Sequence, residues 1–240
     1  MRRSRVRKLP VLLFAATALL HAEDASRSPS FTKRLSATNT QHLDLPAGGT
    51  LRLNKSIGEL TVEGWDQPGL EITTIKWIKI KGDKPPKLDP QQLDKIRVTA
   101  ERKDNDVVVT TAFPKHFTLV RPFTGLSDFE LEYRIKAPRN ANLAIDHDIG
   151  EVHIEGVTGD IHATDGMGQI TVALIPGSQY AIDARSKLGA VDSDPAGEEK
   201  KRLKFGHTFK SQAPAGVRQL FLRAGLGDIT ILETPTPAQK

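Results

Sequence analysis

The chain has 240 residues, with 34 Lys and Arg, 29 Asp and Glu, and no cysteine. The lack of cysteine excludes disulfide bonds, thiolate zinc sites, a cysteine nucleophile and a lipid-anchored cysteine. The formal charge of +5 does not indicate a nucleic-acid partner, because five basic residues lie within the first eight positions and the rest of the chain carries 29 positive and 29 negative side chains.

The first 22 residues predict a secretory signal peptide. Basic residues precede an apolar run from Leu9 to Leu20, LPVLLFAATALL, and the small residue Ala22 follows. This run has 12 residues, whereas a membrane-spanning helix needs about 20. We therefore expect export across the inner membrane to the periplasm or cell surface, with no transmembrane segment in the mature chain. A retained N-terminal anchor is the alternative.

The remaining chain divides by composition. Residues 23–36 are polar without a period and predict a flexible leader, and residues 234–240 contain prolines and predict a disordered tail. Residues 37–233 consist of short alternating runs separated by Gly, Pro, Asn and Asp, a pattern typical of strands and turns. We expect one all-β domain over this range.

An insertion is predicted between residues 67 and 137. A long strand should begin at Leu70, and Asp89 followed by Pro90 predicts one short helix. A β-hairpin should turn at Asp104 and Asn105, and a strand should begin at Phe129. The aromatic and basic segment 113–123 predicts a loop that covers the open edge of the fold, with an exposed binding loop as the alternative.

A unit of about 19 residues recurs along the chain. Copies begin at Pro46, Pro138, Thr158, Pro176, Pro195 and Pro214, and each contains Gly, any residue, aliphatic, any residue, aliphatic, or a weaker form of it. The glycines of this pattern are Gly58, Gly150, Gly168, Gly189, Gly206 and Gly227. A unit of this size that buries its apolar face only when stacked is typical of a parallel β-solenoid. We expect the copies from Pro176 and Pro195 to be irregular.

The alternation assigns the two faces of each strand. Aliphatic residues two and four positions after the glycines should stack inward: Leu60 and Val62, Val152 and Ile154, Ile170 and Val172, and Ile229 and Ile231. Residues one and three positions after the glycines, such as Glu151 and His153, should face solvent. The glycines Gly58, Gly150, Gly168, Gly189 and Gly227 are predicted to be structural, at a point that needs a positive φ or a close backbone approach.

Together the signal peptide, NKSIGELTVEGWD from Asn54, and YRIKAPRNANLAIDHDIGEVHIEGVTGDIHATDGMGQITV from Tyr133 resemble a bacterial family. This is the family of exported, adhesin-like β-solenoid proteins that carry a domain of unknown function. The resemblance covers about residues 37–233. It implies a right-handed, single-stranded β-solenoid in the cell envelope, and it supplies no catalytic residue, cofactor or ligand.

One cluster of titratable side chains suggests chemistry. It comprises Asp146, His147, Asp148, Glu151, His153, Glu155, Asp160, His162 and Asp165. Imidazole and carboxylate groups are transition-metal ligands, so Asp148, His153 and His162 are the candidate metal ligands. However, His153 and His162 are half a coil apart, and His153 should stack on Thr171. We therefore expect solvated outward side chains and predict no metal, cofactor or catalytic residue.

The sequence thus predicts an exported, non-enzymatic binding or structural protein of the cell envelope. It does not identify the partner: an envelope polysaccharide, another protein, or self-assembly through an uncapped strand edge are the options that it leaves open. The alternative is a carbohydrate-active or metal-dependent enzyme on the solenoid surface. An enzyme would need convergent carboxylates or histidines in a concave site, whereas a scaffold would show regular ladders of side chains.

Overall fold

The structure is a computed structural model, and it describes residues 32–81, 94–113, 129–201, 206–211, 214 and 216–233. The strands are β1 (Thr32–Leu43), β2 (Thr50–Trp65), β3 (Leu70–Lys81), β4 (Arg97–Lys103), β5 (Asp106–Ala112), β6 (Phe129–Pro138), β7 (Asn142–Glu155), β8 (Ile161–Leu174), β9 (Tyr180–Leu188), β10 (Val191–Ser193), β11 (Glu198–Lys201), β12 (His207–Lys210), β13 (Arg218–Leu226) and β14 (Ile229–Glu233). The fold is all-β, as predicted, with no α-helix within these ranges. The same ranges contain no helix with the length and apolar character that a membrane span requires.

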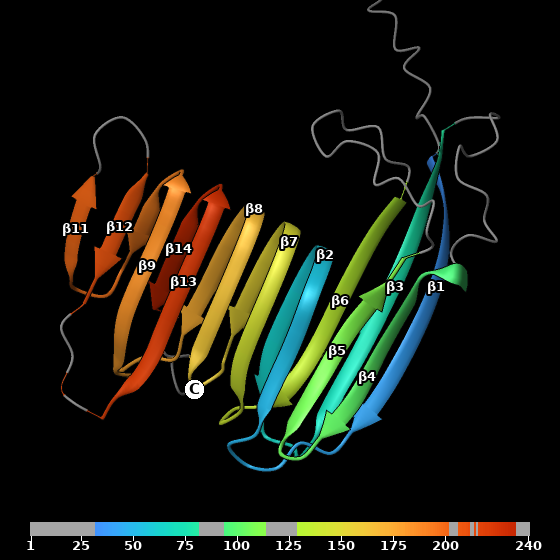
Figure 1. The fold of residues 1–240 in the computed structure, drawn as a ribbon, viewed down its shortest axis with the longest axis horizontal. Helices are drawn as coiled ribbons and strands as arrows, with labels where there is room; N and C mark the ends of the chain where they lie inside the picture. Colours follow the sequence, from blue (N-terminus) through green and yellow to red (C-terminus); the bar gives the residue numbers. More distant parts are fainter. Residues whose placement is uncertain are drawn as a thin grey trace, which may run out of the picture. The chain divides into compact units, whose positions relative to one another are not determined.

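Long bent strands build two walls of sheet. The first half of β2 pairs with β5, from Thr50 to Asn54, and its second half pairs with β6, from Glu59 to Trp65. β7 and β8 continue both walls, because each pairs with its neighbour along nearly its whole length. We call the wall that contains β4, β5, β13, β9, β12 and β11 the first wall, and the wall that contains β1, β3, β6, β14 and β10 the second wall (Figure 1).

The central strands stack in parallel register. β2 pairs with β7, β7 with β8, and β8 with both β13 and β14, which are consecutive in the chain. The outermost stacked unit is formed by β9 and β10, which pair with β13 and β14. The C-terminal unit therefore lies between two units that precede it in the sequence. Similar repeats offer similar pairing edges, so their order along the chain does not determine their order in the stack.

Both ends of the sheet are antiparallel, so the sheet is mixed and differs from the wholly parallel arrangement that the repeat predicts. At one end β1 pairs with β3, and β3 pairs with β6. At the other end the copy from Pro195 forms an antiparallel hairpin of β11 and β12, and β12 pairs with β9. The charged sequence EEKK of β11 has no apolar alternation to bury, so this copy does not form a coil, and Gly206 is not part of the glycine column described below.

The insertion agrees with most of its prediction. β3 begins at Leu70, β6 begins at Phe129, and β4 and β5 form the hairpin that turns at Asp104 and Asn105. The predicted helix at Asp89, the signal peptide, the tail 234–240 and most of segment 113–123 lie outside the described residues. β1 begins at Thr32, inside the predicted leader 23–36. The sequence of β1 is largely polar and therefore does not predict a strand. Backbone pairing with β3 holds it in the sheet.

The predicted inward residues form the core between the walls. Leu60, Val62, Val152, Ile154, Ile170, Val172, Ile229 and Ile231 are each at most 1% exposed. They lie opposite one another in register, for example Val152 beside both Leu60 and Ile170. Each such side chain contributes on the order of 1.5–3 kcal/mol of burial, which is why the stack needs no disulfide.

A column of glycines lies where each unit bends from the first wall to the second. Its members, in stacking order, are Gly58, Gly150, Gly168, Gly227 and Gly189. A β-carbon added at Gly150 would lie 1.8 Å from the carbonyl oxygen of Gly58, and the other contacts between neighbours in the column are as close, at 1.6–2.1 Å. Glycine is required because the backbones of successive units touch at the bend.

Candidate binding surface

The three candidate metal ligands are not brought together. His153 lies on the second wall beside Thr171, as predicted, and its Nε2 lies 3.6 Å from the Glu155 carboxylate. His162 lies on the first wall beside Phe221, with 5.3 Å between the ring centroids. Asp148 is exposed at the end of the first-wall half of β7. Among the described residues, no group of three or more His, Asp and Glu is arranged to hold a metal ion.

Ser56 and His147 form a buried pair that resembles part of a catalytic triad. The Ser56 hydroxyl lies 2.7 Å from Nδ1 of His147, and Nε2 of His147 lies 3.0 Å from the carbonyl oxygen of Gly58. Because a carbonyl only accepts, Nε2 carries the hydrogen and Nδ1 accepts from the serine. Burial lowers the pKa of His147 to about 4, so the ring is neutral at neutral pH. The two residues are 2% and 1% exposed, which leaves no access for a substrate.

Asp165 lies beside His147 in register but does not complete a triad. Its Oδ1 accepts a hydrogen bond of 3.2 Å from the Met167 backbone, and its Oδ2 has no hydrogen-bond partner. Burial raises the pKa of Asp165 to about 7, and the charge of nearby Asp148 adds to this rise. The pair Ser56 and His147 therefore stabilises the bend of the stack, because the imidazole donates to the Gly58 carbonyl. At another unit the Ser186 hydroxyl donates to the Gly227 carbonyl at 2.7 Å in the same way.

The expectation of solvated side chains is wrong for His147 and Asp165, which are 1% and 3% exposed. The reason is the bend of each unit: the buried positions are odd-numbered before it, at Leu143, Ile145 and His147, and even-numbered after it, at Val152 and Ile154. Counting positions from the glycine therefore assigns the inward and outward faces correctly after the bend. It does not assign them before the bend. The outward prediction holds for Glu151 and for the half-buried His153, which follow the glycine.

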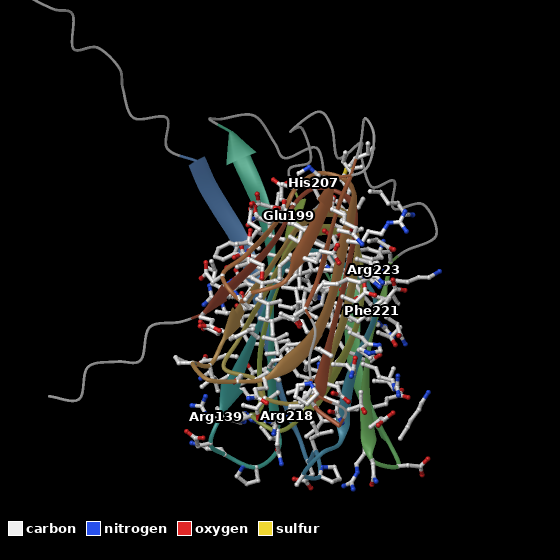
Figure 2. The ribbon with its side chains drawn as sticks, turned by 90° about the vertical axis from the view of Figure 1, so that its left-hand side faces the viewer. Arg139, Glu199, His207, Arg218, Phe221 and Arg223 are labelled. Atoms are coloured by element: carbon white, nitrogen blue, oxygen red, sulfur yellow. The ribbon has the colours of Figure 1, made fainter. Side chains whose placement is uncertain are left out.

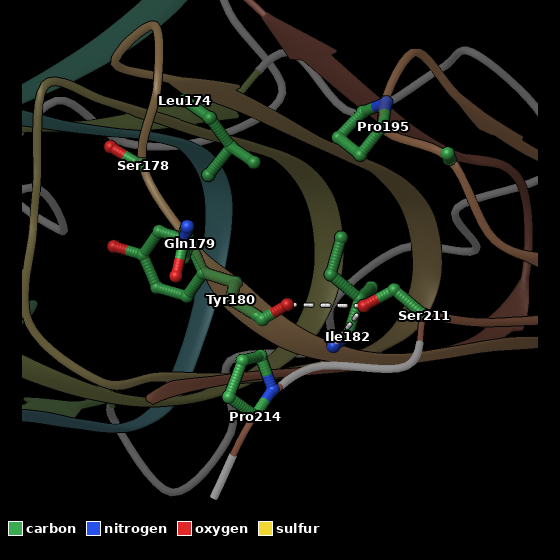
Figure 3. A pocket seen from close by; sticks show the side chains of 9 residues that line it. Leu174, Ser178, Gln179, Tyr180, Ile182, Pro195, Ser211 and Pro214 are labelled. Atoms are coloured by element: carbon green, nitrogen blue, oxygen red, sulfur yellow. Dashed lines mark hydrogen bonds between the residues drawn. The ribbon is translucent and has the colours of Figure 1, made fainter. Parts of the chain in front are cut away.

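A pocket of about 240 Å³ lies at the turn between β8 and β9 (Figure 3). Its walls are mainly apolar and include Leu174, Ile182 and Pro195. The Ser211 hydroxyl lies 3.0 Å from the Tyr180 carbonyl oxygen, and the Tyr180 hydroxyl lies 3.2 Å from two backbone carbonyls. Burial raises the pKa of Tyr180 to about 12. No carboxylate or imidazole lines the pocket among the described residues, so these walls supply no acid or base.

The outer face of the first wall carries an ordered group of aromatic and charged side chains. Phe221 lies between His162 on β8 and Asp183 on β9, and Arg223 lies beside Arg185. We call these five residues the β9–β13 platform. The Arg223 guanidinium stacks on the Phe221 ring at 3.7 Å, a cation–π contact (Figure 2).

Asp183 holds Arg223 and the neighbouring Lys210 in place. Its carboxylate lies 2.9 Å from Nη2 of Arg223 and 3.0 Å from Nζ of Lys210. Burial by itself would raise the pKa of Asp183, but the hydrogen bond from Lys210 and the charge of Arg223 outweigh it and lower this pKa below its usual value. Arg185 has no ion-pair partner among the described residues, so its charge is available to a ligand.

The platform belongs to a basic region, whereas the second wall is acidic. The outward charged residues of β13, β9, β12 and β11 are Arg223, Asp183, Arg185, Lys187, Lys210, Glu198 and Lys200. Among the side chains that the structure describes, those of β3, β6, β2 and β7 on the second wall are Glu71, Glu130, Glu132, Arg134, Lys136, Glu59, Glu63, Glu151 and Glu155. Cations therefore dominate the first group and carboxylates the second, although the sequence after residue 8 is neutral overall.

Sequence reasoning missed the platform because its residues come from three repeats whose stacking order differs from their chain order. Phe221 and Asp183 are neighbours only because β13 is inserted beside β9. The available signal was the placing of an aromatic residue and an arginine, Phe221 and Arg223, two positions apart on one face of the strand in the last repeat. Trp65, at the end of β2, is partly buried and donates to the Gly69 carbonyl at 3.1 Å.

Comparisons with known proteins found matches among solved structures only. No protein-family profile matches the chain, and no curated protein matches it. Among solved structures, a proposed cell adhesion protein from Clostridium sporogenes is 15% identical, with a TM-score of 0.47, over 83% of this chain and all of that one. A proposed adhesin from Bacteroides fragilis is 11% identical, with a TM-score of 0.28, over 82% of this chain and 97% of that one.

Proposed function

We propose that this chain is an exported, non-enzymatic, adhesin-like binding protein of the bacterial cell envelope. Its central strands form the coils of a right-handed β-solenoid that antiparallel strands extend at both ends. The coils hold the β9–β13 platform in place, and the platform binds an anionic polysaccharide of the envelope. The membership of the exported adhesin-like family that the sequence motifs suggest is part of this proposal.

The observation that carries the proposal is the fixed stack of Arg223 on Phe221, braced by Asp183 and flanked by the unpaired Arg185. A side chain that is already ordered loses little conformational entropy when a ligand binds. The guanidinium of Arg185 can bind a ligand carboxylate through two parallel hydrogen bonds. The Nη atoms of Arg223 already donate to Asp183 and to the Leu222 carbonyl, so Arg223 contributes its charge and its flat guanidinium plane. Both arginines lie on a sheet face rather than on a loop.

The non-enzymatic part of the proposal is supported by where the perturbed titratable groups lie. Among the described acids and bases whose usual pKa lies below 8, His147 and Asp165 have the largest shifts, and both are buried in the bend of the stack. An active site requires such groups at a surface that a substrate reaches. In the platform, the pKa of Asp183 is lowered rather than raised, and its carboxylate is already paired with Arg223 and Lys210.

The test is titration of the purified exported chain with polygalacturonate, neutral dextran and double-stranded DNA, followed by calorimetry. We expect saturable binding of polygalacturonate that weakens with salt, because exposed charges are screened. Arg185→Ser should weaken this binding about tenfold, since a charge-assisted hydrogen bond is worth on the order of 1.5–3 kcal/mol.

The matched control is Arg134→Ser, which removes an exposed arginine from the second wall. It should leave binding within about twofold of the wild type, a difference of well under 1 kcal/mol. No binding of polygalacturonate, or an equal loss in the two variants, would overturn the proposed site. Preferred binding of DNA would replace the polysaccharide with a nucleic-acid ligand.

A further inference from the structure

An apolar row runs along the outside of the bend, one position before the glycine column. Its members are Ile57, Ile149, Met167, Leu226 and Leu188, and each lies beside the next in register. Ile57 is 6% exposed and buried, whereas Leu226 is 37% and Leu188 is 46% exposed. Ile149 and Met167 are intermediate. We call Ile149, Met167, Leu226 and Leu188 the corner row.

The two central positions beside the corner row are glycines, so the backbone there carries no side chain. The residues one position earlier are Asp148, Gly166, Gly225 and Lys187, on the same four stacked units. An added β-carbon at Gly225 would lie 2.4 Å from the Gly166 carbonyl oxygen, so these two units approach closely and carry no side chain here. A surface that packs against the corner row can therefore come close to the backbone at its centre.

Opposite charges lie at the two ends of the row formed by Asp148, Gly166, Gly225 and Lys187. Asp148 lies on the first of the four units and Lys187 on the last, and neither has an ion-pair partner among the described residues. A second copy related by a two-fold axis between the Met167 and Leu226 units presents the same row in reverse order. Asp148 then faces Lys187 of the other copy twice, Met167 faces Leu226, and Ile149 faces Leu188.

We propose that the corner row is a self-association surface, at which two copies of this chain pack antiparallel around that axis. An isologous contact must be self-complementary, and the row satisfies this in both apolar character and charge. Four side chains from each copy make a small interface, and interfaces below about 1,000 Å² are weak or transient. We therefore expect a dimer that forms only at high concentration.

The first measurement is sedimentation equilibrium of the purified exported chain from about 5 μM to about 1 mM, the range in which weak association appears. The mass should rise from that of one chain toward that of two. Leu226→Gln should lower the association constant at least about tenfold. Leu232→Gln is the matched control, because Leu232 is 39% exposed but lies on β14 outside the row.

The charge contact has its own test. Asp148→Lys and Lys187→Asp should each weaken the dimer, because each places like charges opposite one another. The double variant Asp148→Lys with Lys187→Asp should restore it. A single-chain mass for the wild type at every concentration would overturn the proposal, as would equal effects of Leu226→Gln and Leu232→Gln, or no recovery in the double variant. None of these variants changes a residue of the platform, and the mass is measured without polysaccharide, so loss of polysaccharide binding leaves this result unaffected.

Discussion

Replacing Gly150 with alanine tests whether close backbone contact at the bend holds the stack together. Gly150 has a φ of +131°, and an added β-carbon would lie 1.8 Å from the Gly58 carbonyl oxygen. A normal contact between carbon and a carbonyl oxygen is about 3.3 Å, so β7 would have to move roughly 1.5 Å away from β2 at this point. Ladder hydrogen bonds of about 2.9 Å would lengthen beyond their useful range on both sides of the bend.

The expected loss is large. A strained backbone conformation costs on the order of 1–3 kcal/mol, and each broken ladder hydrogen bond costs about 1 kcal/mol more. We expect Gly150→Ala to lose at least about 4 kcal/mol of unfolding free energy, which is exceptional for one substitution. For a domain of this size that loss lowers the melting temperature by about 10 °C or more.

A matched control separates contact from conformation. Gly177 also has a positive φ, +75°, but an added β-carbon would meet no atom within 4 Å. Gly177→Ala should therefore lose only about 1 kcal/mol, the cost of the backbone conformation. Urea denaturation of both variants, with the denaturant slope compared to that of the wild type, measures the difference. Equal losses in the two variants would refute the role of the glycine column.

Three further predictions concern single side chains. Ile170→Asp should unfold several units together, because it places a charge at a position that is 0% exposed; unchanged thermal melting would contradict its inward position. His153→Ala should change the unfolding free energy by less than about 1 kcal/mol, since its contact with Glu155 is a surface ion pair; a large loss in the same melting assay would show a buried or ligating role. Burial raises the pKa of Asp165 to about 7 from 3.8, so the folded state holds its proton more tightly, and this stability, present below about pH 4, is lost as pH rises toward 7. Asp165→Asn should therefore gain stability relative to the wild type between pH 4 and pH 7, by at most about 4 kcal/mol; a difference in denaturation midpoint that is constant with pH would contradict the buried carboxyl.

Comparing Asp165→Asn with the wild type also separates the pH dependence caused by Asp165 from that caused by His147. Burial lowers the pKa of His147 to about 4, so its contribution to stability is full above pH 6.5 and is lost as pH falls toward 4. This dependence is present in both proteins and has the opposite sign. The difference between the two curves therefore reports the carboxyl.

The sequence determined the core and the bend of each unit. The spacing of Val152 and Ile154 from Gly150, and of Ile170 and Val172 from Gly168, predicts both burial and register, and the structure agrees. These features are predictable because they depend on local alternation, which a strand expresses within a few residues. The hairpin at Asp104 and Asn105 is local in the same way.

Only the tertiary structure decided which units are neighbours. β13 pairs with β8 and β9, although the copies from Pro176 and Pro195 intervene in the sequence. That order creates the contact of Phe221 with Asp183, the sequence of side chains in the corner row, and the ends marked by Asp148 and Lys187. Repeats with the same apolar pattern fit one another almost equally well, so the stacking order is selected by the edges, the caps and the outward side chains. The spacing of residues within a single repeat contains no information about these contacts.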